Sequence, residues 1–351
     1  MTRVAKRPAR QRGMTLVELM VGMTLGLFLI AGIGSVFVAT GNADRTTQNL
    51  SRLQEGARTA FSMMARDIRE AGLNDCGRID RVMNVLGGAG GPPAWATWNG
   101  GLLGFDAGVS AGDPASGAAV GQRVGTTDAL QIMKGSSRGV SVVQTLAPGG
   151  GQPAAMLVTD DGPFQPGDIA VVCDFSQASI FQITNTNPAG ANNRVVHNSG
   201  GSVSPGNCTM GLGWVQPRIC NPAGRPYNFS INSTLLKFES IVWYVGNNGR
   251  AASGGTSLFR LRLNNAAGTV ATQADELLEG VSGLTMDYLV DGAAQYVNAA
   301  AVTAAGSWND VIAVRINLTM TSAVQDQNAT GGLERMQRQF VHVVTLRNRV
   351  S

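Results

Sequence analysis

Residues 10–43 read RQRGMTLVELMVGMTLGLFLIAGIGSVFVATGNA and are the most informative part of the chain. No charged residue occurs from Leu19 to Ala43, a length that can cross the roughly 30 Å apolar core of a bilayer as a helix. A secretory signal peptide has a shorter apolar run with a small-residue cleavage site after it, whereas the only obvious junction here, Gly13-Met14, lies before the run. These residues therefore predict an N-terminal membrane anchor.

The basic charge of the chain is concentrated ahead of this segment. Five of the 27 basic residues lie within residues 1–13, without an acidic neighbour, so the remainder holds 22 basic and 23 acidic side chains. Without that stretch the protein is nearly neutral and has no basic footprint for nucleic acid, which is not expected as a partner. Positive charge beside a membrane segment indicates instead the side that stays in the cytoplasm.

Glu18 is a single acidic residue at the edge of the apolar run, where an isolated charge is costly. Its natural partner is a cation, and cleavage after Gly13 would create one at the α-amino group of Met14. In a polymer, Glu18 of one subunit could pair with the amine of its neighbour and neutralise both charges. The alternative is that Glu18 reaches the membrane surface as part of an ordinary anchor.

The stretch RQRGMTLVELMVGMTLGL, residues 10–27, resembles the processing site of type IV pilins and of the related pseudopilins of type II secretion. It has a short basic leader ending in Gly13, an apolar residue after it, a glutamate at the fifth position past the junction, and unbroken hydrophobicity beyond. The resemblance implies that a prepilin peptidase cuts between Gly13 and Met14 and methylates the new amine, and that Glu18 guides docking into the filament. Met14 stands where the family usually has phenylalanine, which is a mild change between apolar residues.

The helix is expected to continue past the membrane. Residues 44–72 have an apolar stripe at steps of three and four that should face a partner, while Asp67 and the other charged residues of this stretch should be solvated. The stripe consists of Leu50, Leu53, Ala57, Phe61, Met64, Ile68 and Ala71. Gly72 is expected to cap the helix. No proline occurs between Pro8 and Pro92, so a proline kink is not expected.

The rest of the chain is rich in glycine and poor in charge, which indicates β structure. Residues 73–125 are expected to form a connecting loop, with Trp95 and Trp98 either buried under it or exposed as a contact surface. Residues 126–351 should form the head. Alternating apolar runs bounded by Gly, Pro or Asn predict strands near 129–133, 140–146, 154–160, 168–175, 179–185, 234–245, 257–263, 284–290, 311–320 and 338–347. The predicted fold class is α+β, with a long N-terminal transmembrane and amphipathic helix packed on an antiparallel β-rich head.

Four cysteines occur outside the leader, too few and too widely spaced for a disulfide scaffold. If the head lies outside the cytoplasm, two disulfides are expected. Cys208 is predicted to pair with Cys220, because the stretch between them has the glycines and proline needed to turn back. The other pair would then be Cys76 with Cys173, with free thiols as the alternative.

The C-terminal half narrows the resemblance to PilW-type minor pilins. The segments that carry it are 276–281 (ELLEGV), 308–315 (WNDVIAVR), 338–340 (RQF), 346–349 (LRNR), and Gly167-Asp168 leading into residues 171–174 (VVCD). This family implies a low-abundance subunit that works with other minor pilins and the major pilin at the filament tip. A prepilin peptidase, the inner-membrane assembly platform and membrane lipid are the other partners that it implies.

No pattern in the chain proposes an enzyme, a cofactor or a metal site. It has two histidines; His342 lies in a predicted strand and His197 in a loop, and no nucleophile, base and orienting group occur together. A calcium site at Asp160, Asp161 and Asp168 is a weaker interpretation than turn formation, since their spacing is not that of an EF-hand.

The predicted function is therefore that of a minor pilin that helps to initiate or support type IV pilus assembly, and with it twitching motility and adhesion. The chain would be held in the bacterial inner membrane with its head in the periplasm, and later in the filament at the cell surface. The alternatives are a type II secretion pseudopilin, or a pilus-tip adhesin or DNA-uptake pilin.

Overall fold

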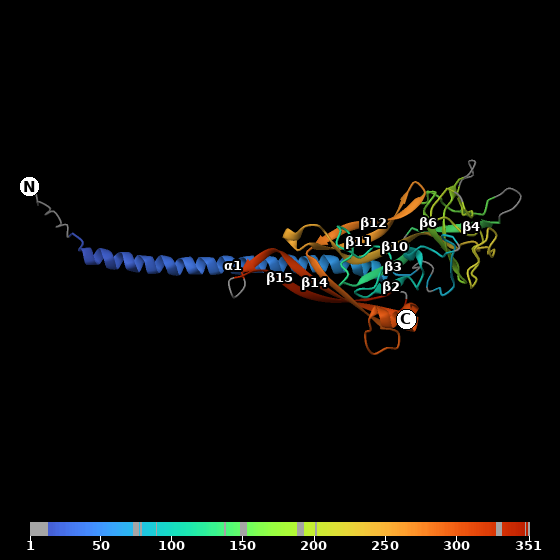
Figure 1. Cartoon of the computed structure of the whole chain (residues 1–351). Helices are drawn as coiled ribbons and strands as arrows, with labels where there is room; N and C mark the ends of the chain where they lie inside the picture. Colours follow the sequence, from blue (N-terminus) through green and yellow to red (C-terminus); the bar gives the residue numbers. More distant parts are fainter. Residues whose placement is uncertain are drawn as a thin grey trace, which may run out of the picture.

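A long helix and two β-sheets make up the part of the chain that the computed structural model describes (Figure 1). That part comprises residues 13–72, 77, 79–88, 90–136, 138–147, 153–187, 193–200, 202–327, 332–347 and 349. The helices are α1 (Leu16–Arg69) and α2 (Ala299–Ala305), with the 3-10 turns η2 (Ala94–Ala96), η4 (Ala251–Ser253) and η5 (Trp308–Asp310). The strands are β1 (Val82–Asn84), β2 (Leu102–Phe105), β3 (Ala129–Gly135), β4 (Val140–Leu146), β5 (Ala155–Val158), β6 (Ile169–Cys173), β7 (Ala178–Gln182), β8 (Asn185–Thr186), β9 (Arg194–Val196), β10 (Thr234–Asn247), β11 (Thr256–Ala266), β12 (Thr269–Glu279), β13 (Val281–Val290), β14 (Val311–Gln327) and β15 (Leu333–Thr345).

Helix α1 has 54 residues and is therefore about 81 Å long at 1.5 Å per residue. It runs without a break from the exposed N-terminal end into the head (Figure 1). Glu70 caps its C-terminal end, donating its N–H to the last carbonyls, and Gly72 follows with a φ of +95°. The expected single helix is confirmed, and it ends within two residues of the predicted boundary.

The C-terminal third of α1 lies between the two sheets (Figure 1). Leu53, Ala57, Met64 and Ile68 from the predicted apolar stripe are buried here. They share one core with Trp243 and its neighbours from the larger sheet, and with the inner face of the smaller sheet. Burying one leucine-sized side chain contributes roughly 1.5–3 kcal/mol, so this stripe holds the helix to the head.

One helix residue departs from the expectation. Asp67 was predicted to be solvated with the other charged residues of α1, but its residue exposure is only 4%. Its neighbours along the helix, Arg66 and Arg69, are exposed as predicted. The reason is that Asp67 faces ionic partners on the larger sheet that are distant in sequence, as described below.

The smaller sheet has the strand order β13-β14-β15 and is antiparallel throughout. In β14 the predicted alternation is observed, because Val314, Ile316 and Leu318 are buried against α1 while Arg315 and Asn317 face outward. The outward row is polar, and Arg315 forms an ion pair with Asp287 of β13. This sheet therefore covers the helix with one apolar face.

The larger sheet has 12 strands and is organised around β10. The first residues of β10 pair with β4 and β6, while the remainder pairs with β3 on one side and β11 on the other. Strand β10 thus joins the part of the head beside α1 to a distal part that contains β4 to β9 (Figure 1). The distal part has its own core, which includes Val172, Phe181, Phe229 and Leu235.

Several elements differ from the expectation. The predicted connecting loop 73–125 contains β1, β2 and η2 among its described residues, and β1 pairs parallel to β7, so the head is not wholly antiparallel. Strand β12 and helix α2 were not predicted either. Strand β12 is exposed along most of its length, so it lacks the apolar alternation that reveals a strand.

Candidate functional site

The N-terminal end of α1 is closed by a capping box formed by Thr15 and Glu18. The Thr15 hydroxyl accepts a hydrogen bond from the Glu18 N–H at 3.3 Å, and Glu18 Oε2 accepts one from the Thr15 N–H at 3.0 Å. This pairing satisfies two amide groups that the helix itself cannot satisfy and places a carboxylate at the positive end of the helix dipole. The Glu18 side chain is therefore directed back toward the Gly13-Met14 bond.

Thr15 was not among the residues predicted for this end of the helix. Its signal was present, because Thr15-Leu-Val-Glu18 before an apolar run is the S/T-x-x-E pattern of a capping box. Gly13 and Met14 precede the helix and are exposed. The predicted cleavage junction is thus accessible, while the predicted assembly residue lies one helical turn beyond it.

The apolar half of α1 packs against nothing in the part of the chain that the structure describes. Residues 13–48 are exposed except for Gly26, and large side chains such as Phe28 and Phe37 are about 80% and 79% exposed. The helix is long and apolar enough to cross a membrane. A soluble monomer rarely exposes a continuous apolar surface of this size, so this half of α1 must be covered by lipid or by other protein chains.

Asp67 joins the opposite end of α1 to the larger sheet. Its carboxylate accepts a hydrogen bond from Trp243 Nε1 at 3.0 Å, and it forms ion pairs at 3.3 Å with Lys134 and with Arg260. Lys134 also contacts Glu70 and Glu239. Burial by itself lowers the pKa of Lys134, but the hydrogen bond to Glu70 and the nearby carboxylates raise it overall. The network thus keeps buried charges paired where the helix ends inside the head.

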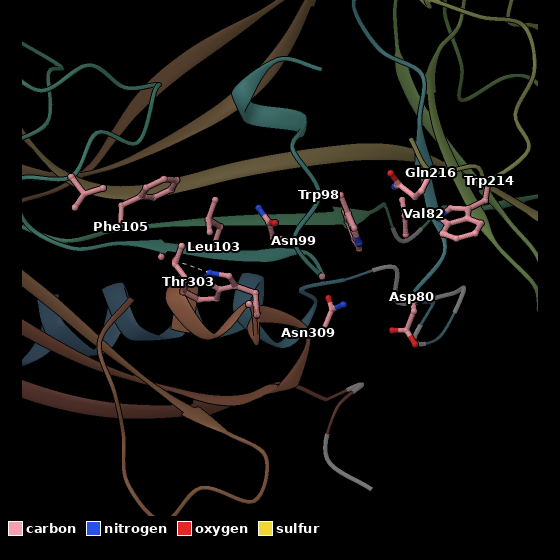
Figure 2. A pocket seen from close by; sticks show the side chains of 15 residues that line it. Asp80, Val82, Trp98, Asn99, Leu103, Phe105, Trp214, Gln216, Thr303 and Asn309 are labelled. Carbon is pink, nitrogen blue, oxygen red and sulfur yellow. Dashed lines mark hydrogen bonds between the residues drawn. The ribbon is translucent and has the colours of Figure 1, made fainter. Parts of the chain in front are cut away.

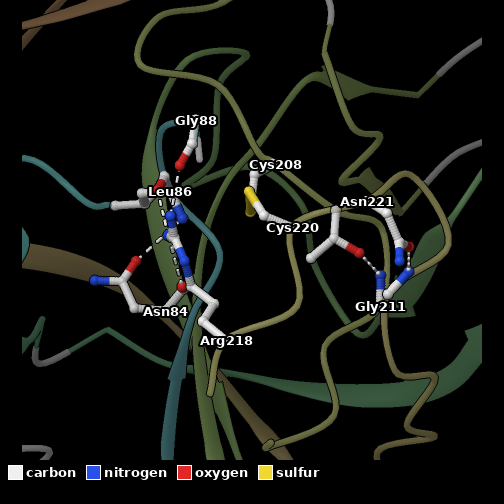
Figure 3. Close-up of a disulfide and its surroundings, with 10 residues drawn as sticks. Asn84, Leu86, Gly88, Cys208, Gly211, Arg218, Cys220 and Asn221 are labelled. Atoms are coloured by element: carbon white, nitrogen blue, oxygen red, sulfur yellow. Dashed lines mark hydrogen bonds between the residues drawn. A yellow bond between two sulfur atoms is a disulfide. The ribbon is translucent and has the colours of Figure 1, made fainter. Parts of the chain in front are cut away.

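The Cys208–Cys220 disulfide is present, as predicted, with a Cα–Cα distance of 5.0 Å (Figure 3). Closing a loop of this length contributes about 3 kcal/mol by the chain-entropy estimate. Arg218, inside the loop, donates hydrogen bonds to the carbonyl oxygens of Asn84, Leu86 and Gly88 (Figure 3). The disulfide loop is therefore held against the segment that follows β1.

The second predicted disulfide pairs Cys76 with Cys173, and Cys76 lies outside the described residues. Cys173 is the last residue of β6 and is buried. The pairing therefore stays a prediction.

Two of the three aspartates considered for calcium accept hydrogen bonds within their own turns, and the third accepts one from a distant asparagine side chain. Asp160 accepts a hydrogen bond from the Gly162 N–H, Asp161 from the side chain of Asn187, and Asp168 from the Gln165 N–H. Asp168 also forms an ion pair with Lys237 at 2.7 Å. Among the described residues no group of three potential metal-ligating side chains occurs. Turn formation is the interpretation that these contacts support.

The two histidines have packing environments. The ring of His342 stacks on Phe61 of α1 with centroids 5.1 Å apart, so it takes part in the contact between helix and sheet. His197 is buried against Phe181, and neither of its ring nitrogens has a hydrogen-bond partner among the described residues. Burial lowers the pKa of His197 to about 4.

His197 makes the stability of the head depend on pH. Above pH 6.5 it is neutral in both states, whereas between pH 6.5 and about 4 the unfolded chain binds a proton that the folded chain excludes. The free energy of unfolding should therefore fall by up to about 3 kcal/mol as the pH drops through this window. Urea unfolding at pH 7 and pH 4.5 checks this. The free energy of unfolding should depend less on pH in His197→Leu than in the unmodified chain, whereas His342→Phe should show the same pH dependence as the unmodified chain. An equal pH dependence in His197→Leu and the unmodified chain would contradict the role of His197.

Two segments of the chain match known protein families, and both belong to type IV pilus proteins or to the N-terminal motif that such proteins carry. Residues 8–34 match the prokaryotic N-terminal methylation motif, which covers the Gly13-Met14 junction, the capping box and the start of the exposed helix. Residues 242–338 match the type IV pilus-assembly protein W family, PilW, from the middle of β10 to the middle of β15. No curated protein and no solved structure matches the chain.

The two family matches and the exposed helix confirm the resemblance to PilW-type minor pilins of the type IV pilus. They support a minor pilin role and a membrane-anchored chain that is later in the pilus at the cell surface. The match at 242–338 also favours the pilus over type II secretion. Pilin families of this kind are structural.

Proposed function

We propose that this chain is a low-abundance pilus subunit that helps to initiate or support type IV pilus assembly, and through it twitching motility and adhesion. Residues 1–13 form the leader, residues 14–43 the membrane and filament-core segment, residues 44–72 the part of the helix that enters the head, and residues 126–351 the head. Cleavage after Gly13 by a prepilin peptidase precedes entry into the filament. The observation that carries this proposal is the contrast within α1, which is uncharged from Leu19 to Ala43, almost wholly exposed up to residue 48, and packed into the head beyond.

Glu18 guides incorporation in this proposal. Cleavage creates a cationic amine at Met14, and the carboxylate of Glu18 is directed toward that end of the helix by its contact with the Thr15 N–H. In the membrane or filament, a carboxylate and an amine that meet across neighbouring subunits neutralise two costly charges. The partners are other minor pilins, the major pilin and the inner-membrane assembly platform.

The first test is the intact mass and N-terminal sequence of the chain from sheared surface filaments and from membranes of the native bacterium. A chain that begins at methylated Met14 in the filament fraction is expected. A chain that still begins at Met1, or that is absent from filaments, would contradict the proposal.

The second test compares three variants in the ratio of filament-bound to membrane-bound chain. Glu18→Ala should lower this ratio by roughly tenfold or more, because breaking a buried ion pair costs about 3–5 kcal/mol. Thr15→Ala removes the capping box but keeps the carboxylate, and Glu55→Ala removes an exposed carboxylate from the same helix. Both should leave the ratio nearly unchanged. If Thr15→Ala lowers it as much as Glu18→Ala, the cap rather than the charge matters.

A further inference from the structure

A cavity of about 580 Å³ lies in the head, lined from four separate parts of the chain (Figure 2). These parts are the residues just before and in β1, the segment from Trp98 through β2, the region of Trp214, and the stretch from α2 to η5. The volume falls within the roughly 300–1,000 Å³ of small-molecule sites. No described residue of α1 lines it, so the cavity is separate from the assembly helix.

Two tryptophans line one end of the cavity together with Val82 (Figure 2). Trp98 is half-buried and packs against the same core cluster as Val82. Trp214 is also half-buried; its backbone N–H donates to Gln177 at 2.9 Å, and the guanidinium of Arg81 lies 5.5 Å from its ring centroid. Both rings are therefore positioned by the fold before any ligand arrives, which lowers the entropy cost of binding.

The indole N–H groups of these tryptophans have no hydrogen-bond partner within the described part of the chain. Both rings are half-buried, and each indole N–H can donate a hydrogen bond to a ligand in the cavity. The third tryptophan of the cavity differs, because Trp308 donates to the Thr303 hydroxyl at 3.0 Å. The indole N–H of Trp308 is therefore already used within the protein, whereas those of Trp98 and Trp214 can donate hydrogen bonds to a ligand.

The polar lining consists mostly of uncharged amides. Asn99, Gln216 and Asn309 line the cavity, and Gln216 and Asn309 are exposed. An amide side chain offers both donors and an acceptor, which matches a hydroxyl group that donates and accepts. Arg349 fixes this region by donating to the carbonyl oxygens of Trp308 and Gly100. The amides are therefore carried on segments that are tied together.

The charge of the lining excludes other ligand classes. Among the described lining residues Asp80 is the only charged one, so this part of the lining offers phosphate or nucleic acid no cationic side chain of its own. An apolar ligand would leave the amides unpaired. A cation is disfavoured because Arg81 already lies over the Trp214 ring.

We propose that this cavity binds a neutral oligosaccharide. The apolar C–H faces of sugar rings stack on Trp98 and on the part of the Trp214 ring that lines the cavity and that Arg81 leaves uncovered, and the sugar hydroxyls exchange hydrogen bonds with the amides of Asn309 and Gln216. The combination of aromatic faces and uncharged amides around one cavity carries this inference. It concerns the head alone and is measured on the purified chain, so its outcome is independent of filament incorporation.

The test is calorimetric titration of the full chain in lipid nanodiscs that contain no glycolipid or sugar-based detergent. The probes are maltose, cellobiose, lactose and diacetylchitobiose with their longer oligomers, and inorganic phosphate and acetylcholine serve as charged comparisons. At least one neutral oligosaccharide should bind, and neither charged probe should. Absence of binding by every neutral oligosaccharide of this set overturns the proposal, as does binding of phosphate or acetylcholine alone.

Variants then place the ligand in the cavity. Trp98→Ala and Trp214→Ala should each raise the dissociation constant by at least roughly tenfold, as expected when a tryptophan that anchors a ligand is removed. Asn309→Ala removes an exposed side chain, leaves the core intact and should weaken binding about three- to tenfold. Phe175→Ala, at an aromatic fully exposed elsewhere, is the control and should bind as the unmodified chain does. Unchanged affinity in both tryptophan variants and in Asn309→Ala would refute the site.

Discussion

Replacing Asp67 with alanine is expected to lower the free energy of unfolding of the head by about 3–5 kcal/mol. Asp67 is buried and is shared by Lys134, Arg260 and the indole N–H of Trp243. Its removal leaves Lys134, whose side chain is only 7% exposed, with the more exposed carboxylates of Glu70 and Glu239. A buried ammonium that loses its closest buried counter-charge is the cause of the large effect.

Urea unfolding of the full chain in detergent, followed by tryptophan fluorescence, measures this loss. Glu55→Ala is the matched control, since it removes a carboxylate from an exposed position of the same helix and should change stability by no more than about 0.5 kcal/mol. The loss of unfolding free energy in Asp67→Asn should lie between those of Asp67→Ala and Glu55→Ala, because the amide keeps an acceptor for Trp243 but not the charge. A loss below about 1 kcal/mol in Asp67→Ala would mean that the ionic network contributes little to docking the helix.

Replacing Gly101 with alanine is expected to cost roughly 3–5 kcal/mol, from conformation and close contact together. Gly101 has a φ of +85°, in the left-handed region where a side chain costs about 1–2 kcal/mol. A Cβ there would lie 2.6 Å from Gly72 Cα and 2.8 Å from Met133 O, and both are backbone atoms that cannot rotate away. Overpacking of this kind adds about 1–3 kcal/mol or more.

The clash occurs where α1 ends. Gly72 N–H donates to Met133 O at 2.9 Å, and Met133 N–H donates to Gly101 O at 2.8 Å, so the chain after the helix is joined to β3 and to the start of β2. Gly108→Ala separates the two causes, because Gly108 has a φ of +80° but a Cβ at this position would meet no atom within 4 Å. It should lose only about 1–2 kcal/mol in thermal or urea unfolding. Equal losses in the two variants would show that conformation alone, and not the close approach, limits position 101.

Local pattern was enough to predict the helix and most strands. The stripe of α1 repeats every three to four residues, and this spacing is a property of helical geometry that does not depend on the partner. Strands β3 and β4 were predicted with starts that agree with the structure, since apolar residues and turn residues mark their boundaries. Strand β12 was missed because most of its residues are exposed and the half-buried ones do not form a regular apolar alternation.

The residues of the candidate sites also fall into those that local sequence reveals and those that depend on distant partners. Gly13, Met14 and Glu18 lie close together in sequence, and even Thr15, which was overlooked, is part of a four-residue pattern. Asp67 was misjudged because its partners are 67, 176 and 193 residues away. A charged residue beside exposed arginines has no local feature that distinguishes it from a solvated one.

The sequence by itself determined the apolar membrane segment and the β-rich character of the head, and it predicts the processing junction at Gly13-Met14 with the acidic residue beside it, because each of these depends on residues close together in the chain. Only the tertiary structure decided that α1 lies between two sheets, that Asp67 is buried in an ionic network, and that Trp98 and Trp214 share a cavity. Those features depend on contacts between residues far apart in sequence. Their formation follows from the packing of β10, α1 and the C-terminal strands around one core, which no local spacing encodes.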